Sequence, residues 1–199
     1  MQRLIFSLCG IIILCGCNGN KTAENKTETV AEPVTATADI TSNFFPVTSY
    51  FKGEILDIKN RGLTLLKTVT IKDKTDTSWI KIPDLDNAFA EFLFPVIDTA
   101  NLKNMFTENK FLDQTLNAFT FSYDAVNDRS DTFAFKRWDV YVDPDNGKVT
   151  RIYLIKRKSA DRELQLTWQS GKWYKIVTLH NVSGKIIAER EEKISRSYE

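Results

Sequence analysis

An acidic run at 143–147, with the sequence DPDNG, contains the residue types that bind calcium. Its two carboxylates and one amide stand close to a glycine, as they do at the start of an EF-hand loop. That loop also requires a bidentate acid at its twelfth position, which here is Leu154. Asp and Asn side chains in such a run also form tight turns by hydrogen-bonding their own backbone. We therefore predict a hairpin turn at 143–147 and no metal site.

The single histidine of the chain, His180, is the next candidate for chemistry, as a general base or a zinc ligand. It lies in the run 180–184 (HNVSG), between two segments that we expect to be strands. A histidine-dependent hydrolase needs a nucleophile and an orienting acid, and a zinc site normally needs several His or Cys ligands. The three cysteines all lie within the first seventeen residues. We interpret His180 as a turn histidine, and we predict no catalytic residue and no cofactor.

Aromatic residues with a spacing of two form the most suggestive cluster in the chain. Alternation places Phe119, Phe121 and Tyr123 on one face of a strand, and it places Phe133 and Phe135 on one face of the next. Inward aromatic side chains of a curved sheet either fill a core or line an apolar pocket. We favour a core because the expected helices need a surface on which to pack. The pocket is the alternative, and it predicts a carrier of an apolar or lipid ligand.

The N-terminal residues have the pattern of an export signal. Arg3 is followed by the apolar run 4–15 (LIFSLCGIIILC), which is too short for a spanning helix of about 20 residues. Gly16 supplies the small residue that a signal peptidase requires just before its cut. The sequence LCGC at 14–17 resembles the lipobox of bacterial lipoproteins, with the departure that Cys15 stands where Ala or Ser is commoner.

The resemblance implies that residues 1–16 are a signal peptide and that Cys17 becomes the new N-terminus with a diacylglyceryl thioether. Two or three acyl chains make a durable membrane anchor, whereas one chain binds only marginally. Asn18 rather than Asp follows the cysteine, which by the same resemblance favours the outer membrane and leaves its periplasmic or surface side open. Residues 18–43 contain no aromatic side chain and are rich in Thr, Ala, Asn and Glu. We therefore expect 17–43 to be a lipidated cysteine followed by a flexible tether.

Residues 44–199 have the length and apolar content of one globular domain. Apolar residues at helical spacing predict a helix from Pro46 to Ile58 that ends near 60–62 (NRG). After it we expect a strand pair at 63–72 and 77–82, followed by helical turns capped by Asp84 and Asp98. From Leu116 onward we expect strands, the last four of which are 149–156, 163–168, 173–179 and 185–194. We predict an α+β domain in which N-terminal helices pack on a curved antiparallel β-meander of about six strands.

Net charge and the absence of a recognisable catalytic motif limit the functions to be considered. The formal charge of +1 gives no global field that would attract nucleic acid. Our leading hypothesis is a non-enzymatic, membrane-anchored binding or interaction module of the cell envelope, whose partners are the membrane, through Cys17, and an envelope protein or apolar ligand. A carrier of an apolar or lipid ligand is the first alternative. The second is a carboxylate-based hydrolase of envelope polymers, which needs two acids about 5–10 Å apart beside a cleft.

Overall fold

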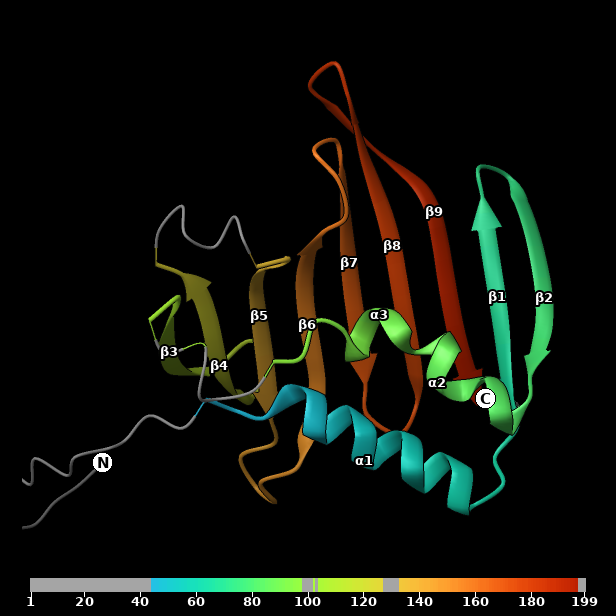
Figure 1. Ribbon diagram of the computed structural model, residues 1–199. Helices are drawn as coiled ribbons and strands as arrows, with labels where there is room; N and C mark the ends of the chain where they lie inside the picture. The colour runs from blue at the N-terminus through green and yellow to red at the C-terminus, as the bar shows by residue number, and fades with distance from the viewer. Residues whose placement is uncertain (1–43, 98–101, 103, 127–132, 197–199) are drawn as a thin grey trace, which may run out of the picture. The chain divides into compact units, whose positions relative to one another are not determined.

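The computed structural model describes residues 44–97, 102, 104–126 and 133–196. Within them the chain forms one nine-stranded antiparallel sheet and a few short helices (Figure 1). The elements in chain order are α1 (Val47–Asn60), β1 (Leu65–Ile71), β2 (Lys74–Ile80), η1 (Ile82–Asp84), α2 (Leu85–Ala88), α3 (Ala90–Leu93), β3 (Phe106–Asp113), β4 (Ala118–Ala125), β5 (Phe135–Val142), β6 (Val149–Arg157), β7 (Arg162–Gln169), β8 (Trp173–Val182) and β9 (Lys185–Arg196). No helix in this described part is long and apolar enough to cross a bilayer.

The strands follow the order β2-β1-β9-β8-β7-β6-β5-β4-β3 across the sheet. The seven strands from β3 to β9 form a meander, in which each strand pairs with its sequence neighbours. The β1–β2 hairpin completes the sheet because β1 pairs with β9, so that early and late segments of the chain lie side by side (Figure 1). The sheet does not close, because β2 and β3 are its two outermost strands.

The predicted antiparallel meander is confirmed, but the sheet has nine strands rather than about six, and the domain is mostly β with a few short helices rather than α+β. The hairpin expected at 63–82 is confirmed as β1 and β2, but its pairing with β9 joins distant segments and leaves no local signal in the sequence. Strand β3 (FTENKFLD) was missed because most of its side chains are exposed at the sheet edge, which removes the apolar alternation of a half-buried strand.

Helix α1 and its end confirm the prediction. Four apolar side chains at spacings of three and four are buried: Val47, Phe51, Ile55 and Ile58. After the last turn the N–H of Leu63 donates to the carbonyl of Ile58 at 3.1 Å, and the N–H of Gly62 donates to the carbonyl of Lys59 at 3.1 Å. This pair of bonds is a Schellman motif, and it requires the positive φ of 60° that Gly62 adopts.

The helical segment after β2 differs from the prediction of a helix capped by Asp84. The structure contains η1 followed by two single-turn helices, and the Asp84 side chain makes no capping hydrogen bond. Phe89 separates the two turns, and both Phe89 and Phe92 contact Trp168 of the sheet. Because a single turn has little helical stability of its own, these tertiary contacts determine its path. The expected turn at Asp98 lies outside the described residues.

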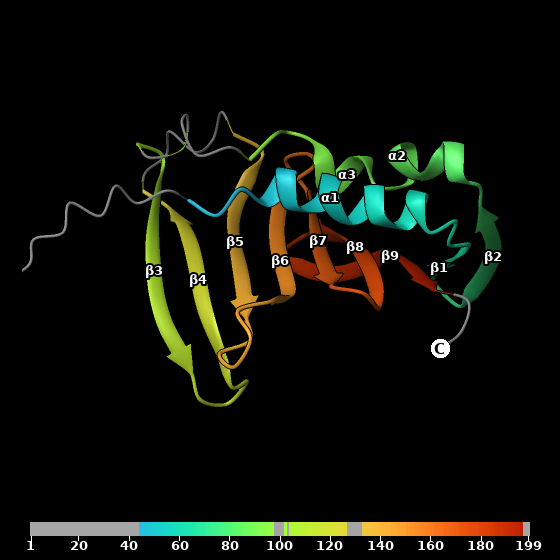
Figure 2. The same ribbon diagram turned by 90° about the horizontal axis from the view of Figure 1, so that it is seen from below.

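The helices pack on one face of the sheet (Figures 1 and 2). The ring centroids of Phe51, Phe89 and Phe92 lie 4.5, 5.2 and 5.3 Å from that of Trp168 on β7. Tyr174 on β8 adds a ring contact with Trp168 at 4.1 Å. All five side chains are fully buried. The core of the domain is therefore an aromatic layer between the helices and the middle of the sheet, where each ring buries a large apolar area.

The run 180–184 is not a loop, contrary to the prediction. Strands β8 and β9 are separated by Ser183 and Gly184 alone, whose φ angles are +53° and +84°. Positive φ at both central positions of a two-residue turn is the type I′ geometry, which matches the twist of the flanking strands. His180 therefore lies within β8. Polar residues near the end of this hairpin concealed the strand in the sequence.

Candidate functional site

The sheet face opposite the helices is here called the open face, because the described helices leave it uncovered (Figure 2). Successive side chains of a strand point to opposite faces, and cross-strand partners point to the same face. Since Trp168 faces the helices, its neighbours along β7 belong to the open face. Two rows of cross-strand partners cross this face: Ser122, Asp139, Tyr153, Thr167, Lys175 and Lys193 in one, and Thr120, Tyr141, Arg151, Gln169 and Trp173 in the other.

Asp139 of β5 is a buried carboxylate on the open face, with 4% of its surface exposed. The hydroxyl of Ser122 on β4 donates to its Oδ1 at 2.6 Å. The guanidinium of Arg137 donates to the same carboxylate at 3.1 to 3.3 Å, and this hydrogen bonding raises the pKa of Arg137. Arg137 also lies 3.6 Å from a carboxylate oxygen of Asp124. These donors compensate the burial of the Asp139 charge.

Two tyrosines flank Asp139. Tyr153 is its cross-strand partner on β6, and Tyr141 lies two residues further along β5. Burial raises the pKa of both phenols, with added contributions from Asp139 at Tyr141 and from Glu163 and Asp139 at Tyr153. Both hydroxyls therefore remain protonated at neutral pH and can donate hydrogen bonds. The guanidinium of Arg151 lies over the Tyr141 ring, 4.0 Å from its centroid.

Trp173 of β8 is the aromatic centre of the other half of the open face. The Nζ atoms of Lys175 and Lys193 lie 5.9 and 5.8 Å from the centroid of its ring, which is within the range of a cation–π interaction. The indole is half-buried. This part of the open face is therefore both aromatic and cationic.

The arrangement offers groups that suit recognition. Half-exposed rings offer apolar contact area, and Arg, Lys and Tyr groups beside them offer donors to acceptor groups of a partner. The Asp139 carboxylate already accepts hydrogen bonds from Ser122 and Arg137. The open face is therefore the candidate binding surface of this chain.

The five aromatic residues predicted as core or pocket occupy unequal environments. Tyr123 and Phe135 have no exposed surface, and Phe121 and Phe133 are partly buried against the core. Phe119 is 45% exposed near the β3–β4 turn. The spacing of two correctly places Phe119 on the same side of β4 as Tyr123, but the helices do not extend over that end of the strand (Figure 2).

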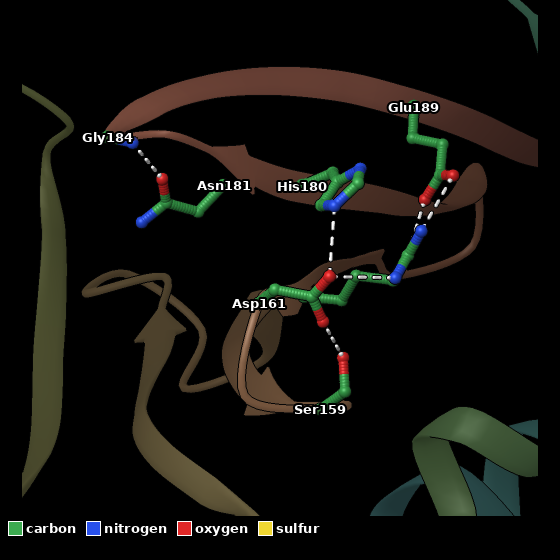
Figure 3. A network of polar contacts seen from close by, with 7 residues as sticks. Ser159, Asp161, His180, Asn181, Gly184 and Glu189 are labelled. Atoms are coloured by element: carbon green, nitrogen blue, oxygen red, sulfur yellow. Dashed lines mark hydrogen bonds and ion pairs between the residues drawn. The ribbon is translucent and has the colours of Figure 1, made fainter.

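His180 takes part in a polar network that joins the β6–β7 turn to β8 and β9 (Figure 3). Its Nε2 lies 3.0 Å from Oδ2 of Asp161, and the hydroxyl of Ser159 donates to the other oxygen of Asp161 at 2.7 Å. Arg162 donates to Asp161 at 3.0 Å and to Glu189 at 2.8 Å. The serine therefore bonds to the acid and not to the histidine, so this group is not ordered as a hydrolase triad. It cross-links three segments of the sheet.

The acidic run 143–147 forms the predicted turn. The Asp143 carboxylate accepts hydrogen bonds from the N–H of Asp145 at 2.8 Å and from the side-chain amide of Asn146 at 2.9 Å. The side-chain oxygen of Asn146 accepts the N–H of Lys148 at 2.9 Å. These oxygens are thus used by the turn itself. Within the described ranges, no three His, Cys, Asp or Glu side chains are grouped so that they could hold a metal ion.

The comparisons with known proteins provide no relative from which a function could be carried over. No protein-family model, no curated protein and no solved structure matches the chain. The predicted lipid-bearing Cys17 lies outside the described residues.

Sequence reasoning missed the open face, although a signal for it was present. Arg137 and Asp139 alternate with the buried Trp138 and Val140 along β5. Two opposite charges at a spacing of two, within a strand that is otherwise apolar and aromatic, indicate an ionic cluster on the second face of the sheet. Its partner Ser122 is on another strand, and this pairing depends on strand register, which the sequence leaves open.

Proposed function

We propose that this chain is a lipid-anchored, non-enzymatic interaction module of the cell envelope that binds a partner protein through the open face. The observation that carries the proposal is the asymmetry of the sheet, since all described helices pack on the other face (Figures 1 and 2). Half-exposed Trp173, beside Lys175 and Lys193, gives the open face an aromatic ring with cationic donors next to it, as an interaction surface requires.

The environment of the candidate residues favours this proposal over the two alternatives. A carboxylate hydrolase needs acids that are free to exchange protons, whereas Asp139 is held by Ser122 and Arg137. A carrier of an apolar ligand needs a cavity lined by the predicted aromatic cluster. Tyr123 and Phe135 of that cluster instead contact neighbouring rings and have no exposed surface.

The membrane anchor is the first part of the proposal to test. Cells that express the chain are fed a clickable palmitate analogue, and label on the purified protein is measured. We expect wild type and Cys15→Ser to be labelled, because Cys15 belongs to the leader that is removed, and we expect Cys17→Ser to lose both the label and flotation with membranes. A labelled, membrane-bound Cys17→Ser protein would contradict the anchor.

The open face is tested by site-specific photo-crosslinking in intact cells. A photoreactive amino acid replaces Thr167, at the centre of the open face, or Leu56, which is 56% exposed on α1. We expect a discrete crosslinked protein from position 167 and none of the same mass from position 56. Equal crosslinking from both positions would contradict a binding role for the open face.

A further inference from the structure

The end of the β3–β4 hairpin carries a cluster of exposed apolar side chains. Phe111 is 49% exposed, Leu112 50%, Leu116 47% and Phe119 45%. Leu112 and Phe119 are cross-strand partners on one face, Phe111 projects from the other face, and Leu116 lies in the turn. The end of the hairpin is therefore apolar on both faces, and it lies away from the helices (Figure 2). Several exposed apolar side chains at one end of a hairpin point to a contact site.

Amphipathic side chains border this cluster. Tyr141 and Arg151 line a shallow hollow of about 150 Å³ together with Leu116. An aromatic residue with a polar tip and a long cation beside an apolar patch are the residue types found where proteins meet the surface of a bilayer. Asp113 is the acid at the turn, and its Oδ1 already accepts the N–H groups of Thr115 and Leu116, at 2.9 and 3.0 Å. These hydrogen bonds lower the cost of removing water from the turn.

The first described residues of the chain pack on the strand that carries the cluster. Phe44, the first described residue, packs on Tyr123 of β4 at 5.2 Å, and the Tyr123 hydroxyl accepts the N–H of Phe45 at 2.9 Å. Tyr123 lies four residues from Phe119, or about 13 Å along the strand. The chain between the proposed lipid and the domain, residues 18–43, has a contour length of about 90 Å. That length is ample for the hairpin end to reach the anchoring bilayer.

We infer that the end of the β3–β4 hairpin inserts into the interfacial region of the bilayer, with Leu112, Leu116 and Phe119 among the acyl chains and Tyr141 and Arg151 at the headgroups. The inference rests on the proposed lipid anchor, which holds the domain at a high effective concentration beside the membrane. The hairpin is then a second, weaker contact that orients the domain on the surface.

Fluorescence from a single labelled thiol tests this contact on the full, lipidated chain. The only cysteines are Cys9, Cys15 and Cys17, so under the proposal an introduced cysteine is the one free thiol of the mature protein. Leu116→Cys and the matched control Ile186→Cys are labelled with an environment-sensitive dye. Ile186 is 67% exposed and apolar, but it lies in the β8–β9 hairpin. Both proteins are reconstituted on vesicles of phosphatidylethanolamine and phosphatidylglycerol.

We expect a blue-shifted emission that is quenched by spin-labelled lipid at position 116, and an unshifted emission at position 186. Adding Phe119→Ser to Leu116→Cys should reverse the shift, with circular dichroism verifying the fold. A chain that floats with the vesicles while the probe at 116 stays aqueous would overturn the hairpin contact and leave the anchor intact. A chain that does not float would overturn the anchor and the contact that rests on it. A shift that appears without vesicles and grows with protein concentration would overturn bilayer contact in favour of self-association.

Discussion

The two faces of the sheet use aromatic residues in opposite ways. Trp168 on β7 faces the helices and is fully buried among the rings of Phe51, Phe89 and Tyr174. Trp173, on the adjacent strand, faces the open side, where the cationic side chains of Lys175 and Lys193 lie beside its ring. The same residue type thus stabilises the fold on one face and remains accessible to a partner on the other. Strand alternation places the two rings on opposite faces, and coverage by the helices then determines which ring is buried.

The largest expected effect comes from removing each tryptophan in turn. We expect Trp168→Ala to lower the free energy of unfolding by about 3–5 kcal/mol, because it leaves a large cavity in the aromatic core. Trp173→Ala should lower it by about 1 kcal/mol, since the lost contacts are partly exposed. Urea denaturation of both variants measures the difference. Equal losses would show that the two faces contribute alike to stability and would break the comparison.

Alkaline unfolding should report on the helix-covered face in particular. Burial raises the pKa of Tyr174 from 10.0 to about 12. A raised pKa in the folded protein stabilises it fully below pH 10, and this stability, roughly 2–3 kcal/mol, is lost as the pH rises through about 12. We therefore expect Tyr174→Phe to flatten the fall of unfolding free energy between pH 10 and 12, and Tyr153→Phe on the open face to flatten it less. Identical slopes for wild type and Tyr174→Phe would contradict the burial argument.

Asp139 provides the corresponding test of the open face. Its replacement in Asp139→Ala leaves the buried hydroxyl of Ser122 without its acceptor and removes the hydrogen bonds from Arg137, so we expect a loss of about 2 kcal/mol in unfolding free energy. The control Glu191→Ala removes an exposed ion pair with Lys175, whose atoms are 3.7 Å apart, and should change stability by less than about 0.5 kcal/mol. Chemical denaturation at neutral pH compares them. A loss for Glu191→Ala that matches the loss for Asp139→Ala would refute the cluster's special role.

The smallest effect is expected on the acid side. Burial raises the pKa of Glu192, but hydrogen bonds and charges from Lys67 and Arg190 outweigh it, so the pKa is lowered from 4.5 overall. A lowered pKa in the folded protein contributes stability above pH 4.5 that is lost as the pH falls through the folded value. In Glu192→Gln, the unfolding free energy lost on acidification should be smaller than in wild type by about 1 kcal/mol or less. Thermal unfolding from pH 6 down to pH 3 measures it, and an unchanged acid slope would argue against the pairing.

Local signals in the sequence predicted the local structure well. The spacing of Phe51 and Ile55 with the glycine at 62 located α1 and its end, and the DPDNG run located a turn. Pairings between distant segments were not predictable, because no local sequence pattern around Leu65 indicates that it pairs with Arg196. The open face was missed for a related reason. Asp139 is buried only because β4 and β6 lie on either side of it, and strand register determines that environment.

Lysine footprinting tests the central claim most directly, because the open face carries Lys175 and Lys193 while α1 carries the exposed Lys52. Intact cells and the purified protein are treated briefly with an acetylating reagent, and the rate at each lysine is read by mass spectrometry. We predict that Lys175 and Lys193 react more slowly in cells than in the purified protein, while Lys52 reacts equally in both. Equal rates in cells and in purified protein at the open-face lysines would contradict the account.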